Sequence, residues 1–283
     1  MSTPPPHQRN TSGSSFRQRL GYYLVGVAIG LVALGFLWSN RQQAVAKQAG
    51  TMAGAGLPAE PTGDGTEGEV AAVREYVFVL IRTGPLAEPT PEQMQEAMAG
   101  HFANMGRLRD EGMLFIAGPF GEPKPADYRG LWIFNAETVE AGLAAGATDP
   151  AVEMGVFRLE AAVFRSADPL KELNRLEKED EARRLADPDV PDEWQGRGYI
   201  VATAPVSETP GFERGNGVLI EGTLVGDESN TMTSTVDTRL VVLDAETPEA
   251  AGALLGADAE KWTLHGWYSS TMVAELPGVA GDG

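Results

Sequence analysis

An internal repeat constrains the fold of this chain more than any single motif does. Residues 131–141, LWIFNAETVEA, return as residues 240–250, LVVLDAETPEA. Each copy is predicted to be an apolar strand that turns at Asn or Asp and leads into a helix. Pro248 suits the first turn of the second helix, because an N–H at that position would have no helical partner. Shorter segments around the two copies also repeat, so the chain is predicted to contain two related units.

Apolar runs and helical spacing predict the elements of the first unit. Strands are expected at residues 76–81, 113–120, 130–135 and 156–164, and helices from Pro91 to about Glu111 and over residues 137–145. The first helix should bury a stripe of apolar residues at three- and four-residue spacing: Met94, Met98, Phe102, Met105 and Leu108. The order strand-helix-strand-strand-helix-strand is that of a ferredoxin-like unit, an antiparallel sheet with both helices on one face.

The second unit is predicted to be a degraded copy of the first. Strands are expected at residues 198–204, 218–224, 239–243 and 264–274, with a helix at 247–255. Its first helix should be missing, because the segment 205–217 contains Pro210 and three glycines. We therefore expect an α+β fold of two tandem ferredoxin-like units packed on each other, with the strands at 76–81 and 131–134 meeting the strand at 240–243.

The N-terminal region contains a candidate membrane span. The run from Leu20 to Trp38 has no charged residue. At ~1.5 Å per residue a helix of this length would measure about 28 Å, close to the ~30 Å of a bilayer core. A cleaved signal peptide is the alternative, since Ala44-Val45-Ala46 resembles a cleavage site. The short basic N-terminus should stay in the cytoplasm, which would place the C-terminal region outside it, in the periplasm.

The predicted organisation has seven parts. They are a disordered basic N-terminus (1–19), a transmembrane helix (20–38), a flexible linker (39–72), the first unit (73–166), a charged linker helix (167–195), the second unit (196–276) and a tail (277–283).

Composition excludes several functional classes. The formal net charge is −18, although residues 1–50 hold five Lys or Arg and no Asp or Glu. The rest of the chain is therefore strongly acidic. This argues against a nucleic-acid partner, because phosphate groups are bound by basic side chains. The absence of cysteine excludes disulfides, thiol catalysis and Cys-ligated metals, and three histidines argue against a His-based metal site. Neither a phosphate loop nor a dinucleotide motif indicates a cofactor.

Two motifs carry a family resemblance. Residues 101–112 follow the pattern His-Phe-x-x-Met-x-x-Leu-x-x-Glu-Gly and run into Ile116-Ala117-Gly118-Pro119, and residues 149–157 are DPAVEMGVF. Over residues 75–165 the chain resembles the YCII-related family. The resemblance implies a dimeric α/β-barrel, in which two such sheets pack face to face, and a helix histidine that lines a small pocket. The second unit has no counterpart of that histidine and has Thr223 where the first has Pro119, so it should not form the pocket.

His101 is the candidate catalytic residue, and Gly118 and Pro119 are candidate ligand-binding residues. An imidazole titrates near neutral pH and could act as a general acid or base on a small acyl or carbonyl ligand. The helix of His101 offers no orienting carboxylate, because Asp110, nine residues on, lies half a turn away. Asp127 and Glu160 are the candidate partners from elsewhere, and we expect no well-formed dyad. His265 should be structural.

Three functional hypotheses follow. The protein could be a membrane-anchored binding or scaffold protein, or an accessory subunit of a membrane complex with protein partners or a second copy of itself. The degraded second unit and the long linker favour the first of these, the binding or scaffold role. It could instead be a small-molecule enzyme that uses His101. A cavity reached by His101 and a carboxylate would favour the enzyme.

Overall fold

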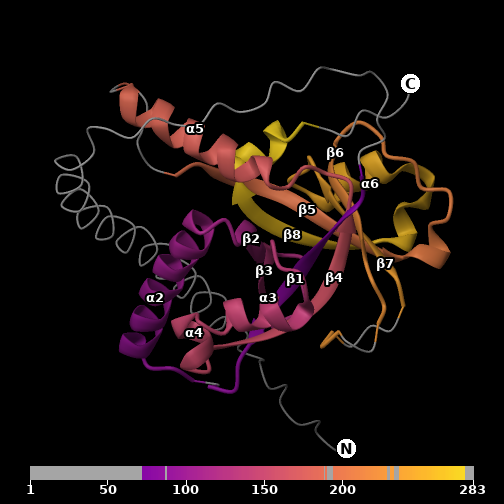
Figure 1. Ribbon diagram of the computed structural model, residues 1–283. Helices are drawn as coiled ribbons and strands as arrows, with labels where there is room; N and C mark the ends of the chain where they lie inside the picture. Colours follow the sequence, from indigo (N-terminus) through magenta and orange to yellow (C-terminus); the bar gives the residue numbers. More distant parts are fainter. Residues whose placement is uncertain are drawn as a thin grey trace, which may run out of the picture. The chain divides into compact units, whose positions relative to one another are not determined.

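The computed structural model describes residues 72–86, 88–187, 189, 194–227, 230–232 and 236–277. They belong to one compact unit, Gly65–Gly283. Within these residues, eight antiparallel strands form a closed barrel with the order β1-β3-β2-β8-β5-β7-β6-β4 (Figure 1). The strands are β1 (Arg74–Thr83), β2 (Leu114–Gly121), β3 (Tyr128–Phe134), β4 (Phe157–Ser166), β5 (Gly196–Pro205), β6 (Val218–Leu224), β7 (Thr238–Leu243) and β8 (Thr263–Ser270).

Helices lie between the strands. The α-helices are α2 (Pro91–Asp110), α3 (Val139–Gly146), α4 (Pro150–Glu153), α5 (Glu172–Ala186) and α6 (Pro248–Leu255), and the 3-10 helices are η1 (Val206–Glu208), η2 (Gly256–Lys261) and η3 (Thr271–Glu275). The long helix α2 begins with a capping box in which Thr90 and Gln93 bond reciprocally, and Pro91 follows the cap. It ends before Gly112, whose φ of 72° a glycine adopts without strain.

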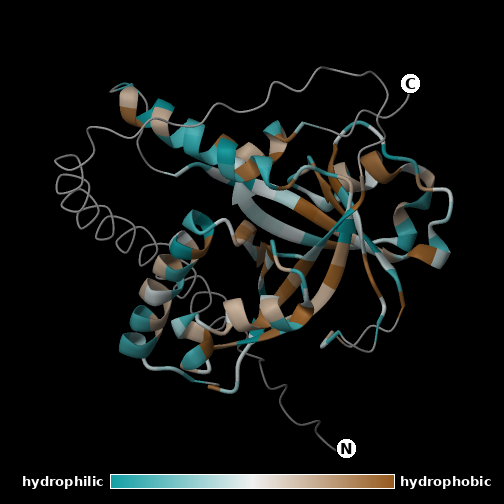
Figure 2. Cartoon of the chain, in the orientation of Figure 1, coloured by the Kyte–Doolittle hydropathy of each residue, from teal (hydrophilic) through white to brown (hydrophobic). Residues whose placement is uncertain are grey.

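In the first half of the barrel, which comprises β1 to β4, the central strands β1 and β3 bury both faces, as their continuous apolar sequences predict. In β1, Phe78 and Leu80 belong to the core inside the barrel, whereas Val77 and Val79 belong to the core outside it, beneath the helices. Strand β1 lies between β3 and β4, with Val79 opposite Trp132 and Ala161. In Figure 2 brown, hydrophobic stretches run along the strands, with paler stretches in β5 and β8, whereas α5 is mostly hydrophilic.

The second half of the barrel, which comprises β5 to β8, repeats this strand pairing, but other elements pack on its outer face. Strand β5 lies between β7 and β8, and Ile200 is opposite Leu243 and Gly266. Tyr199 and Val201 face the barrel core, and Ile200 belongs to the outer core, which includes residues of α6. Between β5 and β6 the only described helix is the short η1.

Two strand pairs, called seams below, join the two halves of the barrel. Strand β2 pairs with β8 through Phe120–Trp267 and Gly121–Gly266, and β4 pairs with β6 through Phe164–Leu224 and Arg165–Thr223. The backbones approach closely at both seams. A Cβ atom on Gly118 would lie 2.2 Å from the carbonyl oxygen of Tyr268, and one on Gly222 would lie 2.4 Å from the Phe164 ring. Both positions therefore require glycine.

The prediction of two ferredoxin-like sheets packed face to face is wrong. The end strands of the halves pair edge to edge instead, so the strands form one closed barrel and not two stacked layers. The physical reason is that open sheets would leave N–H and C=O groups unpaired along β2, β4, β6 and β8, and closure satisfies these edges. The strands of residues 76–81 and 240–243 are thus members of the same barrel.

The membrane helix included in the fold prediction finds no support in the described part of the chain. There, no helix is both long enough and apolar enough to cross a bilayer. The predicted span itself, Leu20–Trp38, lies outside the described residues.

Candidate functional site

The candidate site forms where α2 meets the short helix α4. Ala97 and Ala151, both fully buried, lie in the core between these helices. A Cβ atom on Gly100 would lie 2.6 Å from the Cβ of Pro150, so only glycine permits this approach. Small residues on both helices thereby bring His101 on α2 close to Asp149, the residue that precedes α4.

Asp149 is a fully buried carboxylate with three hydrogen-bond donors. Its Oδ1 accepts the backbone N–H of Ala151 at 3.0 Å and caps α4. Its Oδ2 lies 3.0 Å from Nδ1 of His101 and accepts Nδ2 of Asn104 at 3.3 Å. A buried carboxylate is stabilised by such donors, and an ionised one can only accept. Nδ1 of His101 therefore carries the proton, and in the neutral ring Nε2 has a free lone pair.

A second layer of polar groups fixes Asn104. Its Oδ1 accepts from Arg107 Nη2 at 2.8 Å and lies 3.3 Å from Thr148 Oγ1, whose single proton serves either this oxygen or the carbonyl oxygen of Ala145 at 2.7 Å. Arg107 also donates to Thr148 Oγ1 at 2.9 Å. Because the amide oxygen is held by these donors, the amide nitrogen must face Asp149. The network sets the position of the carboxylate from two sides.

Aromatic rings hold the imidazole of His101. The ring stacks on Trp132 of β3, with centroids 5.5 Å apart and planes inclined by 23°. Phe102 and Phe157 contact it edge-on at 5.6 and 5.3 Å. His101 is 7% exposed, and its Nε2 neither makes a hydrogen bond nor counts among the fully buried unpartnered atoms of the described residues. This nitrogen is therefore unpaired among the described residues and is not fully enclosed by them.

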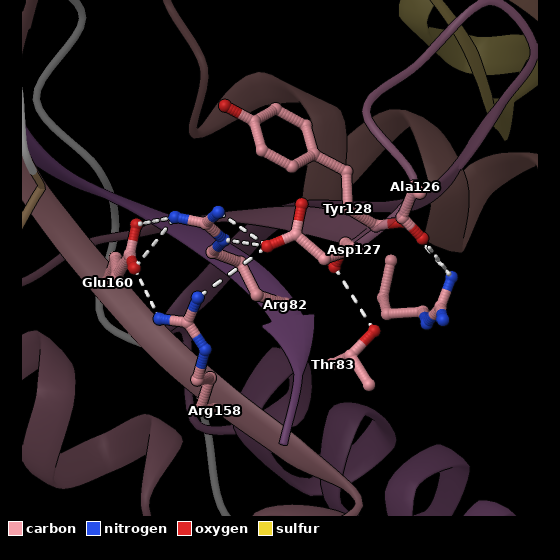
Figure 3. A network of polar contacts seen from close by, with 8 residues as sticks. Arg82, Thr83, Ala126, Asp127, Tyr128, Arg158 and Glu160 are labelled. Carbon is pink, nitrogen blue, oxygen red and sulfur yellow. Dashed lines mark hydrogen bonds and ion pairs between the residues drawn. The ribbon is translucent and has the colours of Figure 1, made fainter. Parts of the chain in front are cut away.

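Asp127 and Glu160 do not orient His101. Figure 3 shows both carboxylates on Arg82, with Glu160 2.9 Å from Nη1 and Asp127 2.8 Å from Nε. Arg158 adds a second cation, 3.6 Å from Asp127. Desolvation acts to raise the pKa of Asp127, but the hydrogen bond and charge of Arg82 hold it below the ordinary value. These two acids belong to an ion-pair network of β1, β4 and the segment before β3.

Gly118 and Pro119 lie on β2 opposite Leu131 and Gly130 of β3. Gly118 also faces β8 at the seam, where a Cβ atom would lie 2.6 Å from the indole nitrogen of Trp267. The bonded and ring contacts of His101 involve Asp149, Trp132, Phe102 and Phe157 instead. The packing of the barrel accounts for the glycine.

The sequence reasoning missed the role of Asp149. The candidate carboxylates were Asp127 and Glu160, although Asp149 begins the second of the two family motifs, residues 149–157. A signal was present, because Asp before Pro is typical of a helix N-cap, and a capping carboxylate has a second oxygen free for another donor. That oxygen receives His101 and Asn104.

The described residues show a cavity inside the barrel that is lined by His265 and by neither His101 nor Asp149, so it is not the cavity that was expected to favour an enzyme, and the case for chemistry at His101 rests on its contact with Asp149. Among these same residues, no cluster of His, Asp and Glu is suited to hold a metal ion. Comparisons with family models, curated proteins and solved structures gave no match. The resemblance to the YCII-related family therefore stays a prediction, and the site is interpreted from its own geometry.

Proposed function

We propose that this protein is a small-molecule enzyme in which His101 acts as general base and acid on a small acyl or carbonyl substrate. One observation carries the proposal. The fully buried Asp149 binds Nδ1 of His101 at 3.0 Å, while Nε2 has no partner among the described residues. A carboxylate that fixes one ring nitrogen leaves the other oriented for proton transfer.

The chemistry follows from these positions. Nε2 removes a proton from the substrate or from a water molecule, and the electron pair of the broken bond stays on the reacting atom. The imidazolium that forms is stabilised by Asp149, because both the charge and the Nδ1–H bond favour it. Nε2 then returns the proton to the leaving group or product. Stacking on Trp132 holds the ring in its plane throughout.

A structural role for the pair is the competing interpretation. His101 and Asn104 both bond Asp149 and tie α2 to α4. If that were their only role, a side chain that keeps the hydrogen bond but lacks the second nitrogen should serve equally well. His101→Asn is such a variant, since its amide N–H reaches the place of Nδ1 and nothing replaces Nε2.

The first experiment determines the tautomer. Nitrogen-15 spectra of the full chain at neutral pH should show Nδ1 of His101 protonated and Nε2 unprotonated. With three histidines in the chain, single His variants assign the signals. The reverse tautomer would contradict the proposal, because Nε2 could then not act as a base.

The second experiment measures turnover. Small esters, thioesters and lactones would be tested for hydrolysis, and small ketones for exchange of α-hydrogen in D₂O. We expect His101→Asn to lower the rate by ~10²–10⁴-fold while the folded state is retained, as for other general bases. Turnover that is unchanged in this variant, or absent for every compound, would overturn the proposal.

The binding or scaffold role and the accessory-subunit role stay predictions. They require a partner protein, which affinity purification of the full chain in mild detergent would identify. Loss of such a partner in a variant with normal turnover would separate these roles from the chemistry of His101.

A further inference from the structure

The barrel contains a partly open cavity of about 190 Å³ to which both halves contribute. Phe78 and Ala162 line it from the first half, and Thr203 and His265 from the second. Phe120 and Tyr128 add two further aromatic rings. The volume is below the ~300–1,000 Å³ of sites for drug-sized molecules, so an occupant must be small.

His265 is the unusual group in this wall. It is 7% exposed, its Nδ1 is fully buried, and it makes no hydrogen bond to the described residues. Its neighbours are the rings of Phe120 at 5.8 Å and Tyr128 at 5.7 Å. Buried polar side chains are normally paired, and an unpaired one calls for an explanation.

The tautomer of His265 can be inferred from its surroundings. Burial lowers the pKa of His265 below its ordinary value of 6.5, so the ring is neutral at pH 7. A buried N–H without an acceptor is rarer than a buried acceptor without a donor. The proton therefore belongs on Nε2, which is not among the fully buried unpartnered atoms. His265 thus offers an unused N–H donor.

No charged side chain is found among the described residues that line the cavity, since none of them is Asp, Glu, Lys or Arg. Arg82 lies over the Tyr128 ring, 5.5 Å from its centroid, and is paired with Asp127 and Glu160. Tyr128 is uncharged as well, because burial raises the pKa of its hydroxyl. A charged ligand would lose its hydration in this cavity without finding a counter-ion.

We propose that the barrel interior binds a small, uncharged, ring-containing molecule through a hydrogen bond from His265 to a carbonyl or similar acceptor on that molecule. The rings of Phe78, Phe120 and Tyr128, together with aliphatic side chains, supply the contact area, and the unpaired donor of His265 supplies the specificity. The cavity is separate from the site of His101, because successive residues of β1 face the barrel interior and the outer core in turn. Phe78 and Leu80 line the cavity, whereas Val77 and Val79 belong to the outer core that includes Trp132.

Three matched probes test this proposal in the full chain by isothermal titration. Acetophenone has a ring and an acceptor, ethylbenzene has nearly the same shape without the acceptor, and benzoate adds a charge. We expect acetophenone to bind at least ~10-fold more tightly than ethylbenzene, as one hydrogen bond to an otherwise unpaired donor implies. Benzoate should bind more weakly than acetophenone.

Two variants locate the binding. His265→Phe keeps an aromatic ring but lacks the donor, so it should abolish the preference for acetophenone over ethylbenzene. Ala162→Leu should fill the cavity and weaken the binding of both neutral probes. This variant provides the test of location if His265→Phe does not fold. Absence of binding by both neutral probes, equal affinities in the unaltered protein, or affinities that Ala162→Leu leaves unchanged would overturn the proposal.

Discussion

The two halves of the barrel share one strand pairing but cover it with different groups. The first half has the strand order β4-β1-β3-β2, and α2, α3 and α4 contribute to the core on its outer face and beside it. The second half has the order β8-β5-β7-β6 and has α6 and η2. The first half has the long helix α2 between its first two strands, whereas the second half has the connection after η1 at the equivalent place. Phe212 of this connection packs edge-on against Trp262, with ring centroids 5.0 Å apart.

This difference shows what the candidate site depends on. The barrel strands are similar in both halves, but the His101–Asp149 pair stands only where α2 and α4 meet. In the second half the outer core is mainly aliphatic, with Trp262 and Phe212 as its aromatic members, and the indole nitrogen of Trp262 is buried without a hydrogen-bond partner among the described residues. The site therefore belongs to the helical cover of the first half, and the barrel serves as its support.

The largest expected effect comes from removing one outer tryptophan in each half. Trp132 is 1% exposed and Trp262 is 6% exposed. Replacing either by alanine should lower the free energy of unfolding by ~3–5 kcal/mol, measured by urea denaturation. Only Trp132→Ala should also shift the nuclear resonances of His101, because only Trp132 stacks on that ring. An equal shift in Trp262→Ala would show that the halves are not independent.

Two glycines of α2 provide a smaller and sharper test. Gly100→Ala places a methyl group 2.6 Å from Pro150 and should lower the free energy of unfolding by ~1–3 kcal/mol. Gly106→Ala is the matched control on the same helix, since no atom lies within 4 Å of its Cβ position. It should raise the stability by ~0.4–1 kcal/mol, because alanine favours the helix. Gly100→Ala should also displace the Nδ1 signal of His101. The same sign for both variants would refute the close approach of α2 and α4.

The smallest effect concerns pH and His265 on the inner face. Because burial lowers its pKa below 6.5, the unfolded chain binds this proton more readily than the folded one. The free energy of unfolding should thus fall as the pH drops below ~6.5, by at most ~1.4 kcal/mol per pH unit, with no contribution above that pH. Tyr128 stays neutral over this range, since its pKa is raised.

Urea denaturation at several pH values, compared between the unaltered protein and His265→Gln, isolates this contribution. The other titrating groups are common to both proteins and cancel in the comparison. Curves of identical slope would show that His265 is not buried as a neutral ring.

Local signals predicted many of the elements. Thr90, Pro91 and Gly112 mark the ends of the first helix, which was expected from Pro91 to about Glu111 and runs to Asp110. The alternation of inner and outer faces along β1 follows from its continuous apolar sequence. These signals act within single strands and helices, so turns and periodicity specify each element, whereas the pairing of Val77 with Val163 joins distant parts of the chain.

Closure of the barrel could not be predicted in the same way. The apolar runs fit either two stacked sheets or one barrel, and the choice depends on which strand edges meet across the whole chain. The partner of His101 was hidden for a related reason. Asp149 reaches His101 only because Gly100 lets α4 approach α2, and helical periodicity describes one helix at a time.

The two seams also bear on how the chain folds. The pairing of Phe120 with Trp267 joins segments from opposite halves, so it must follow the slow closure of a very long loop. Until then β2, β4, β6 and β8 are open edges that other chains could join, and such intermediates are prone to aggregate. During synthesis, the first half emerges with Phe78 and Leu80 still awaiting the strands that enclose them. The time between completion of the first half and closure of both seams is therefore the period in which newly made chains are most vulnerable to aggregation.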